Sequence, residues 1–591
     1  MNKKGFTLVE LLAVIAILAI LVIIALPNVL KMYNNAKKNS FLTEAKTLAR
    51  DVSSKYITES MKGNKLTTIS NKQNSLDLSG RNIEYNFELD SQGKIKRMMV
   101  YDGTYCVVTT KDYTNLKTTD ISDKCSHEEL YNIVGTLSKN FYEKSGKTDR
   151  NLVKSIEFYS DGRTIEGANS YDVSKAQDKS IIMYIKENSE NSSLLDLTIV
   201  AKGIISFPED SSKLFTFNRF NGSSRYSNLT SIQFNHSVDT SKVTDMSYMF
   251  YITEKSNLKT LELSDFDTSN VITMSYMFDN STATEIKGLE KFNTSKVTNM
   301  SHMFLNSKAT TLDLSSFDTS KVTDMGYMFT GSEATEIKGL NKFNTSNVTN
   351  MGGMFGHIKV KILDLSKFDT SKVTDMGYMF NSSETTEIKG LNKFNTSNVT
   401  YMSSMFESSK ATTLDLSNFD TSNVTGMYSM FSRSEVTTLD LSSFDTSKVT
   451  DMRNMFYGSK VTTLDLSSFD TSKVTKMGSM FNGSEATEIK GLEKFNTSNV
   501  TDMGYMFAGS KVTTVNLSSF DTSKVTYMRG MFASSKVTTL DLSSFDTSNV
   551  TDINLMFWEA KATTGYARTQ ADADKFNASS NKPRALTFTV K

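Results

Sequence analysis

The chain has 591 residues, enough for several average domains or for one long repeat array. Its 66 basic and 65 acidic residues almost cancel, so it lacks the overall positive field of nucleic-acid-binding proteins, and we expect no nucleic-acid partner. A hydrophobic content of 38% is compatible with a folded chain that also carries one membrane segment.

The N-terminus contains an apolar segment that predicts a membrane anchor. Residues 11–26 are apolar without interruption, and with 6–9 the segment reaches about 20 residues, close to one bilayer crossing. Lys3 and Lys4 precede it and favour a cytoplasmic N-terminus, although three lysines also follow the segment. Glu10 lies inside the segment, where a carboxylate costs roughly 2.5–3.5 kcal/mol, so we expect a positive partner group from another chain or from a newly formed N-terminus.

This N-terminus resembles the type IV prepilin signature. The matching residues are Gly5, Phe6, Thr7, Leu8, Val9 and Glu10, followed by the apolar run and Pro27. The resemblance implies that prepilin peptidase cleaves between Gly5 and Phe6, that Phe6 is N-methylated, and that Glu10 pairs with the Phe6 amine of a neighbouring pilin subunit. An ordinary secretory signal and a plain membrane anchor are the alternatives; no Ala-x-Ala pattern closes the apolar run, which weakens the first.

A helical pattern continues beyond the membrane segment. Apolar residues recur at steps of three or four at Phe41, Ala45, Leu48, Val52 and Tyr56. We expect one helix to about residue 60, bent near Pro27, with a small sheet on its second half. The candidate strands are 82–89, 94–101 and 104–110, the first two joined by a turn of polar residues and glycine. A helix with a small antiparallel sheet is the layout that the pilin resemblance implies.

Cys106 and Cys125 are the chain's two cysteines and lie 19 positions apart. A disulfide would close a loop of about 20 residues and stabilise it by ~3 kcal/mol, provided that the compartment is oxidising. Two unpaired thiols are the alternative.

A repeat fills more than half of the chain. The dipeptide Met-Phe recurs with phenylalanine at 250, 278, 304, 329, 355, 380, 406, 431, 456, 481, 507, 532 and 557. After the first interval of 28, every interval is 25 or 26 residues, a period typical of leucine-rich-repeat-like solenoids. The repeats contain 25 of the 31 methionines, which we interpret as adaptable core residues.

One unit, residues 311–329, illustrates the expected local structure. Leu312 and Leu314 alternate with Asp313, which predicts a short strand, and a polar turn follows. Met325 and Met328 then follow helical spacing, so we expect one or two turns of helix in each unit. Strands of neighbouring units should pair in parallel about 4.8 Å apart.

The units resemble the 25–26-residue leucine-rich repeats of BspA-like bacterial surface proteins, including those of Listeria. The resemblance rests on Phe-Asp-Thr-Ser-x-Val-Thr-x-Met-x-x-Met-Phe stretches such as 444–456. It implies a cell-surface role in adhesion without a fixed ligand. We therefore expect an α+β pilin-like part with a long hydrophobic helix and a small antiparallel sheet, followed by an α/β leucine-rich-repeat-like solenoid with a parallel sheet.

The expected organisation divides the chain into six segments. They are a leader (1–5), a pilin helix (6–60) whose membrane half is 6–26, a small sheet region (61–126), a connector and N-terminal cap (127–235), about 13 repeats (236–560) and a C-terminal cap (561–591).

Charged residues form a ladder on the expected sheet face. The outward strand positions are Glu262, Lys287, Asp313, Lys338, Asp364, Lys389, Asp415, Asp440, Asp465, Lys490, Asn516 and Asp541. Opposite charges on adjacent strands stabilise the stack modestly, and like charges disfavour it. Asp415, Asp440 and Asp465, the acidic row, are therefore a candidate contact face for a basic ligand or a cation, with a simple solvated face as the alternative.

The sequence contains no pattern that predicts an enzyme, a metal site or a cofactor. We interpret the chain as a minor or tip pilin-like subunit with an adhesin-type head. It would lie in the cytoplasmic membrane with its N-terminus inside, then reach the cell surface, where a protein or glycan would be its ligand. A pseudopilin-like part of a secretion or DNA-uptake machine and a non-assembling membrane-tethered surface protein are the alternatives.

Overall fold

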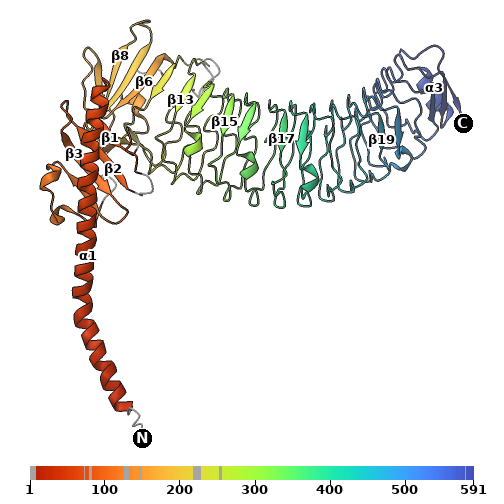
Figure 1. Cartoon of the computed structure of the whole chain (residues 1–591). Coiled ribbons are helices and arrows are strands. Elements are labelled where there is room, and N and C mark those ends of the chain that lie inside the picture. The colour runs from red at the N-terminus through yellow and green to blue at the C-terminus, as the bar shows by residue number, and fades with distance from the viewer. Residues whose placement is uncertain are drawn as a thin grey trace.

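The computed structural model describes residues 8–71, 74–78, 83–125, 132–145, 150–216, 228–251, 256–579 and 581–591, without the side chains of 8–12, 18–25 and 28. A long helix projects from a small sheet, and a curved stack of repeats extends sideways from that sheet to the C-terminal end (Figure 1). We call each 25–26-residue repeat a coil and the whole stack the repeat array.

Helix α1 runs from Leu8 to Met61 and passes through Pro27 without a break. Its end agrees with the expected position near residue 60. Within the described part of the chain, no helix is both long enough and apolar enough to cross a membrane, and the expected membrane half, 6–26, falls partly outside that part.

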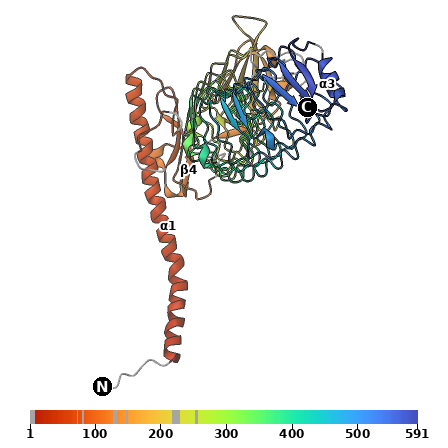
Figure 2. The same cartoon turned by 90° about the vertical axis from the view of Figure 1, so that its right-hand side faces the viewer.

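The second half of α1 packs on a four-stranded antiparallel sheet (Figure 2). The strands, in spatial order, are β1 (Thr68–Ser70), β2 (Glu84–Leu89), β3 (Ile95–Tyr101) and β4 (Cys106–Thr109). The sequence predicted the last three within two residues and missed β1. Ala45, Leu48 and Val52 are fully buried on the helix, in one core with Phe87 and Val100 of the sheet, so the apolar face predicted for α1 is confirmed.

A second region of sheet lies between the helix and the repeats. Five strands occur in the order β11-β6-β9-β8-β7 and three more in the order β12-β10-β5. Their bounds are β5 (Ile133–Thr136), β6 (Val153–Tyr159), β7 (Asn169–Asp172), β8 (Ile181–Glu187), β9 (Leu195–Ala201), β10 (Ile204–Ser206), β11 (Ser231–Gln233) and β12 (Val238–Asp239). The described residues of the two regions also form short 3-10 helices: η1 (Tyr113–Asn115), η2 (Thr118–Asp120), η3 (Phe141–Ser145) and η4 (Arg150–Leu152). One hydrophobic core runs from Leu137 in this region through all of the repeats to Phe588.

The repeat array contains short parallel strands that pair two by two. The pairs are β13 (Thr260–Glu262) with β14 (Glu285–Lys287), β15 (Thr311–Asp313) with β16 (Glu336–Lys338), β17 (Ile362–Asp364) with β18 (Glu387–Lys389), and β19 (Thr463–Asp465) with β20 (Glu488–Lys490). A 3-10 helix follows the second strand of each pair: η5 (Leu289–Lys291), η6 (Leu340–Lys342), η7 (Leu391–Lys393) and η8 (Leu492–Lys494). The expected parallel pairing is confirmed for these coils.

The prediction of one or two helical turns in each unit is wrong, because the Met-x-x-Met-Phe segment forms a series of tight turns. The residue before the second methionine is left-handed in every coil, with φ between 55° and 62° from Tyr248 to Leu555, which ends any α-helix. The backbone donors also point to the next coil: Tyr276 N–H donates to Ser301 O at 3.0 Å and Phe278 N–H to Met303 O at 2.9 Å. Inter-coil bonds thus replace the bonds of a helix.

The phenylalanine of each Met-Phe pair forms a continuous buried ladder. From Phe250 to Phe557 the rings stack with centroids 5.4–6.3 Å apart and planes within 18° of parallel. Phe215 of the preceding region continues the ladder at 5.5 Å from Phe250. The methionines on either side, such as Met274 and Met277, are fully buried, so their interpretation as core residues is confirmed.

The C-terminal end of the array is closed by α3 (Gln570–Asn577) and by the three-stranded parallel sheet β21 (Thr539–Leu542), β22 (Thr564–Ala567) and β23 (Thr587–Val590). In earlier coils a buried threonine hydroxyl donates to a backbone carbonyl of the next coil, as Thr522 does to Asp546 O at 2.9 Å. The last such threonine, Thr547, donates its N–H and its hydroxyl to the carboxylate of Asp572, at 3.1 and 2.7 Å. Asp572 therefore provides the hydrogen-bond acceptor that a backbone carbonyl of the next coil provides elsewhere in the array.

We expect Asp572→Ala to destabilise the array. Asp572 is 3% exposed, and its removal leaves the buried N–H and hydroxyl of Thr547 without their acceptor, a loss of about 1–3 kcal/mol. Chemical denaturation followed by circular dichroism measures the free energy of unfolding. Asp574→Ala, on the exposed side of the same helix, is the matched control and should change it by less than about 0.5 kcal/mol. Equal effects of the two substitutions would contradict the capping role.

Candidate functional site

The residues expected for processing and assembly, Gly5, Phe6 and the side chain of Glu10, lie outside the described residues. Between residues 13 and 30 of α1, the described side chains include exposed apolar ones: Val14, Ile17, Val29 and Leu30 are 44–59% exposed. A long apolar surface of this kind marks a site of contact with lipid or with another protein. Figure 1 shows this part of α1 standing clear of the rest of the chain.

Cys106 and Cys125 are joined by a disulfide, with their Cα atoms 6.1 Å apart. The bridge closes the loop that contains η1 and η2. Two lysines of α1 hold this loop, since Lys38 Nζ donates to Ile121 O at 3.4 Å and Lys46 Nζ to Thr114 O at 3.2 Å. The disulfide and these bonds fix the loop against the helix just beyond the exposed apolar residues Val29 and Leu30.

The charge ladder of the sheet face has the expected register. Glu262 lies opposite Lys287, Asp313 opposite Lys338, Asp364 opposite Lys389 and Asp465 opposite Lys490. Strands pair where a Thr-Leu-Asp type of coil is followed by a Glu-Ile-Lys coil. The alternation of charge along the sequence thus coincides with the alternation of paired strands.

The acidic row lies where this alternation is interrupted. Asp415, Asp440 and Asp465 are all exposed, and the residues around Asp415 and Asp440 form no strand. Each carboxylate accepts the backbone N–H of the serine two residues later, at 3.0 Å in Asp440 and Asp465. Hydrogen bonds from these serines lower the pKa of all three carboxyl groups, so the row is negative at neutral pH. Among the residues that the structure describes, no group of three or more histidine, cysteine or acidic side chains is placed to hold a metal ion.

A second charge ladder, on another edge of the coils, was missed by the sequence analysis. Its members are Lys308, Glu333, Lys359, Glu384, Lys410, Glu435, Lys460, Glu485 and Lys511. Neighbours form ion pairs, for example Lys308 with Glu333 and Lys410 with Glu435, both at 3.3 Å. The signal was available, because these residues alternate in sign at the same spacing of 25 or 26.

One column of aromatic side chains, mostly tyrosines, is half-buried in the repeats and partly stacked. Tyr248, Tyr276, His302 and Tyr327 stack in order, with centroids 4.4, 4.2 and 5.0 Å apart. Their faces cover one another, so edges rather than faces are open to solvent. Beside the stack, burial raises the pKa of Asp279 to about 7, although hydrogen bonds from Asn280 act in the opposite direction.

This buried carboxyl group makes the first coils sensitive to pH. Since the folded pKa lies above the ordinary value of 3.8, Asp279 stabilises the fold at low pH, and that stability is lost as pH rises through about 7. We expect Asp279→Asn to raise the free energy of unfolding by about 1–3 kcal/mol at pH 8 and to have little effect at pH 4. Denaturation curves at both pH values test this, with the half-buried Asp267→Asn variant as control. An equal effect of Asp279→Asn at the two pH values would contradict it.

Comparison with known families gives two matches. Residues 1–26 match the family described as prokaryotic N-terminal methylation motif. The family described as Mycoplasma protein of unknown function, DUF285, matches the overlapping segments 218–338, 328–388, 381–490 and 483–582. Neither is a family of enzymes. No curated protein and no solved structure gives a significant match.

The matches support the N-terminal resemblance and leave the BspA-like resemblance as a prediction. The methylation motif indicates a type IV pilin-like or pseudopilin-like protein, processed by prepilin peptidase and assembled with other pilin subunits. The DUF285 segments follow one another over more than half of the chain and include the repeat array. The chain therefore carries a prokaryotic N-terminal methylation motif and belongs to the DUF285 family.

Proposed function

We propose that this protein is a minor or tip subunit of a type IV pilus and that its repeat array is an adhesin-type binding domain. The methylation motif at residues 1–26 carries the proposal. It is supported by the packing of α1: the described side chains between residues 13 and 30 include exposed apolar ones, and the second half of the helix is covered by an antiparallel sheet. A pilin-like subunit packs the first half of this helix against other subunits in the filament, and the second half carries the domain that is exposed on the filament surface.

The shape of the chain supports a minor or tip position. The repeat array extends sideways from the axis of α1, and its C-terminal end lies far from the helix (Figure 1). Such a head on every subunit would crowd its neighbours in a filament. We place the array, as a BspA-like leucine-rich-repeat solenoid, on the outer surface of the cell, after a stage in the cytoplasmic membrane with the N-terminus inside.

The domain limits follow the same proposal: leader 1–5, pilin helix 6–60, sheet region 61–126, connector and N-terminal cap 127–235, repeats 236–560 and C-terminal cap 561–591. The partners are other pilin subunits and prepilin peptidase on one side and a surface protein or glycan on the other. The acidic row, Asp415, Asp440 and Asp465, is part of the proposed contact face, because it is exposed and interrupts the neutralising alternation of charges. A pseudopilin-like role is the second candidate, since the methylation motif is compatible with both assemblies.

The experiment is immunogold labelling of producing cells with antibody to the repeat array. The unsubstituted chain should label filaments, whereas Gly5→Val should block cleavage and Glu10→Ala should permit cleavage but remove the charge partner needed for assembly. Both variants should lose filament label, and Asp51→Ala, on the exposed side of α1, is the control that should retain it. Label confined to membrane foci would favour the pseudopilin-like role. Even envelope label that persists without prepilin peptidase would reject both.

A further inference from the structure

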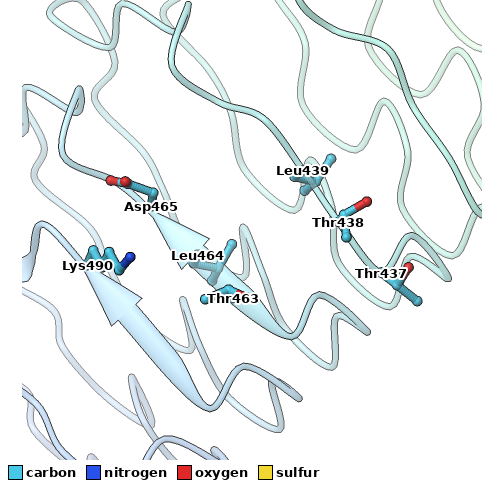
Figure 3. A pocket seen from close by; sticks show the side chains of 7 residues that line it. All are labelled: Thr437, Thr438, Leu439, Thr463, Leu464, Asp465 and Lys490. Atoms are coloured by element: carbon cyan, nitrogen blue, oxygen red, sulfur yellow. The ribbon is translucent and has the colours of Figure 1, made fainter.

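The sheet face of the repeat array contains a hollow of about 260 Å³ beside the acidic row (Figure 3). Its lining residues are Thr437, Thr438, Leu439, Thr463, Leu464, Asp465 and Lys490. The first three come from one coil, the next three from β19 and the last from β20. The threonines, the aspartate and the lysine are exposed, so the hollow is open to a ligand from solvent.

The hollow exists because two coils of the same type are neighbours at this point. In the paired strands β15 and β16, by contrast, a Thr-Leu-Asp coil is followed by a Glu-Ile-Lys coil, so that Thr311 has Glu336 as its neighbour. Here Thr438 occupies the position that glutamate has in the other type of coil, and its side chain is much shorter. Residues 437–439 form no strand, while β19 pairs with β20 on its other side. The short side chain and the missing strand leave the space open.

The chemistry of the lining excludes most classes of charged ligand. A basic ligand would meet the ammonium group of Lys490, and an anion would meet the carboxylate of Asp465. Asp465 is held as an acceptor by the Ser467 N–H at 3.0 Å, and Lys490 lies 3.8 Å from Glu488. Three threonine hydroxyls add groups that both donate and accept hydrogen bonds. Leu439 and Leu464 supply a small apolar surface between these polar groups.

A sugar ring fits this combination. It is uncharged, its hydroxyls donate and accept, and its C–H face is apolar. The volume lies just below the range of roughly 300–1,000 Å³ of drug-sized pockets, so one ring rather than a larger group is the appropriate size. Exposed threonine pairs lie at 412–413, 437–438 and 462–463 in three successive coils. The next coil has Thr487-Glu488 at this position, and threonine pairs return at 513–514 and 538–539. Neighbouring coils lie about 4.8 Å apart, so the three successive pairs form a polar threonine row beside the hollow for a short chain of sugars.

We propose that the hollow and the adjoining threonine row bind a linear, uncharged glycan, with one sugar in the hollow and the polymer lying along the array. This names the ligand class of the proposed adhesin-type domain and rests on that function. The hydroxyls of Thr438 and Thr463 and the Asp465–Lys490 pair bind the seated sugar, and the leucines contact its C–H face.

The test is calorimetric titration of the purified full-length chain in detergent. The probes are neutral hexasaccharides of β-linked glucose, N-acetylglucosamine, xylose and mannose, with the corresponding disaccharides. We expect at least one hexasaccharide to bind, and to bind more tightly than its disaccharide. Thr438→Gln fills the hollow with an uncharged side chain of the size found in the alternating coils and should weaken binding by about tenfold or more.

Thr311→Val is the matched control. Thr311 occupies the position of Thr463 in a coil that has Glu-Ile-Lys coils on both sides, so binding should stay within about twofold. Circular dichroism of both variants checks that the fold is retained. The inference is overturned if no neutral oligosaccharide binds, if Thr438→Gln binds as well as the unsubstituted chain, or if polylysine or a uronic acid polymer binds in place of the neutral glycans.

This experiment is independent of filament assembly. Glycan binding by a chain that never labels filaments would overturn the pilus proposal and keep the inference. Filament label without glycan binding would keep the pilus proposal and overturn the glycan inference.

Discussion

The repeat array depends on one constraint: each coil satisfies its backbone hydrogen bonds through the coils on either side. A chain of parallel bridges joins Asp245 to Thr273, Asn299 and Asp324 and continues to Asp552. The left-handed residue in each Met-x-x-Met-Phe segment turns the backbone donors toward the next coil and at the same time ends any helix. A single coil therefore has neither a hydrogen-bonded backbone nor a closed core, and the fold is cooperative along the stack.

The same constraint explains why the ends of the array are built differently from its middle. At the start, Phe215 stacks on Phe250, so the preceding sheets share the core of the first coil. At the other end, Asp572 and Lys575 of α3 bind groups of the last coil that would otherwise contact a following one, the lysine donating to Thr547 O and Val550 O at 2.7 and 2.9 Å. Side chains of α3 thus make the hydrogen bonds that the backbone of a further coil would otherwise make.

Period and polarity in the sequence were enough to predict the architecture but not the local geometry. The Met-Phe spacing predicted the stacking, and the alternation of aspartate and lysine predicted the register of the strand pairs, because both are set by contacts between equivalent positions. The spacing of Met325 and Met328 suggested a helix, since burial every third residue looks the same in a helix and in a series of tight turns. The left-handed backbone at Tyr327 has no sequence signature, because a tyrosine there is held by stacking on its neighbours. The hollow beside Asp465 could not be predicted, because it depends on how side chains of different size from three adjacent coils lie next to one another. The sequence pattern alone does not give those positions.

Helix α1 and the repeat array have complementary roles in a surface-displayed pilin-like subunit. Exposed apolar side chains of α1 such as Val14, Ile17 and Val29 offer a surface for other subunits, and the array offers a long polar face to solvent. Mass spectrometry of the native protein tests this account most directly. It predicts a mature chain that begins with N-methylated phenylalanine at position 6, after loss of residues 1–5. An intact Met1 on protein recovered from the cell surface would contradict it.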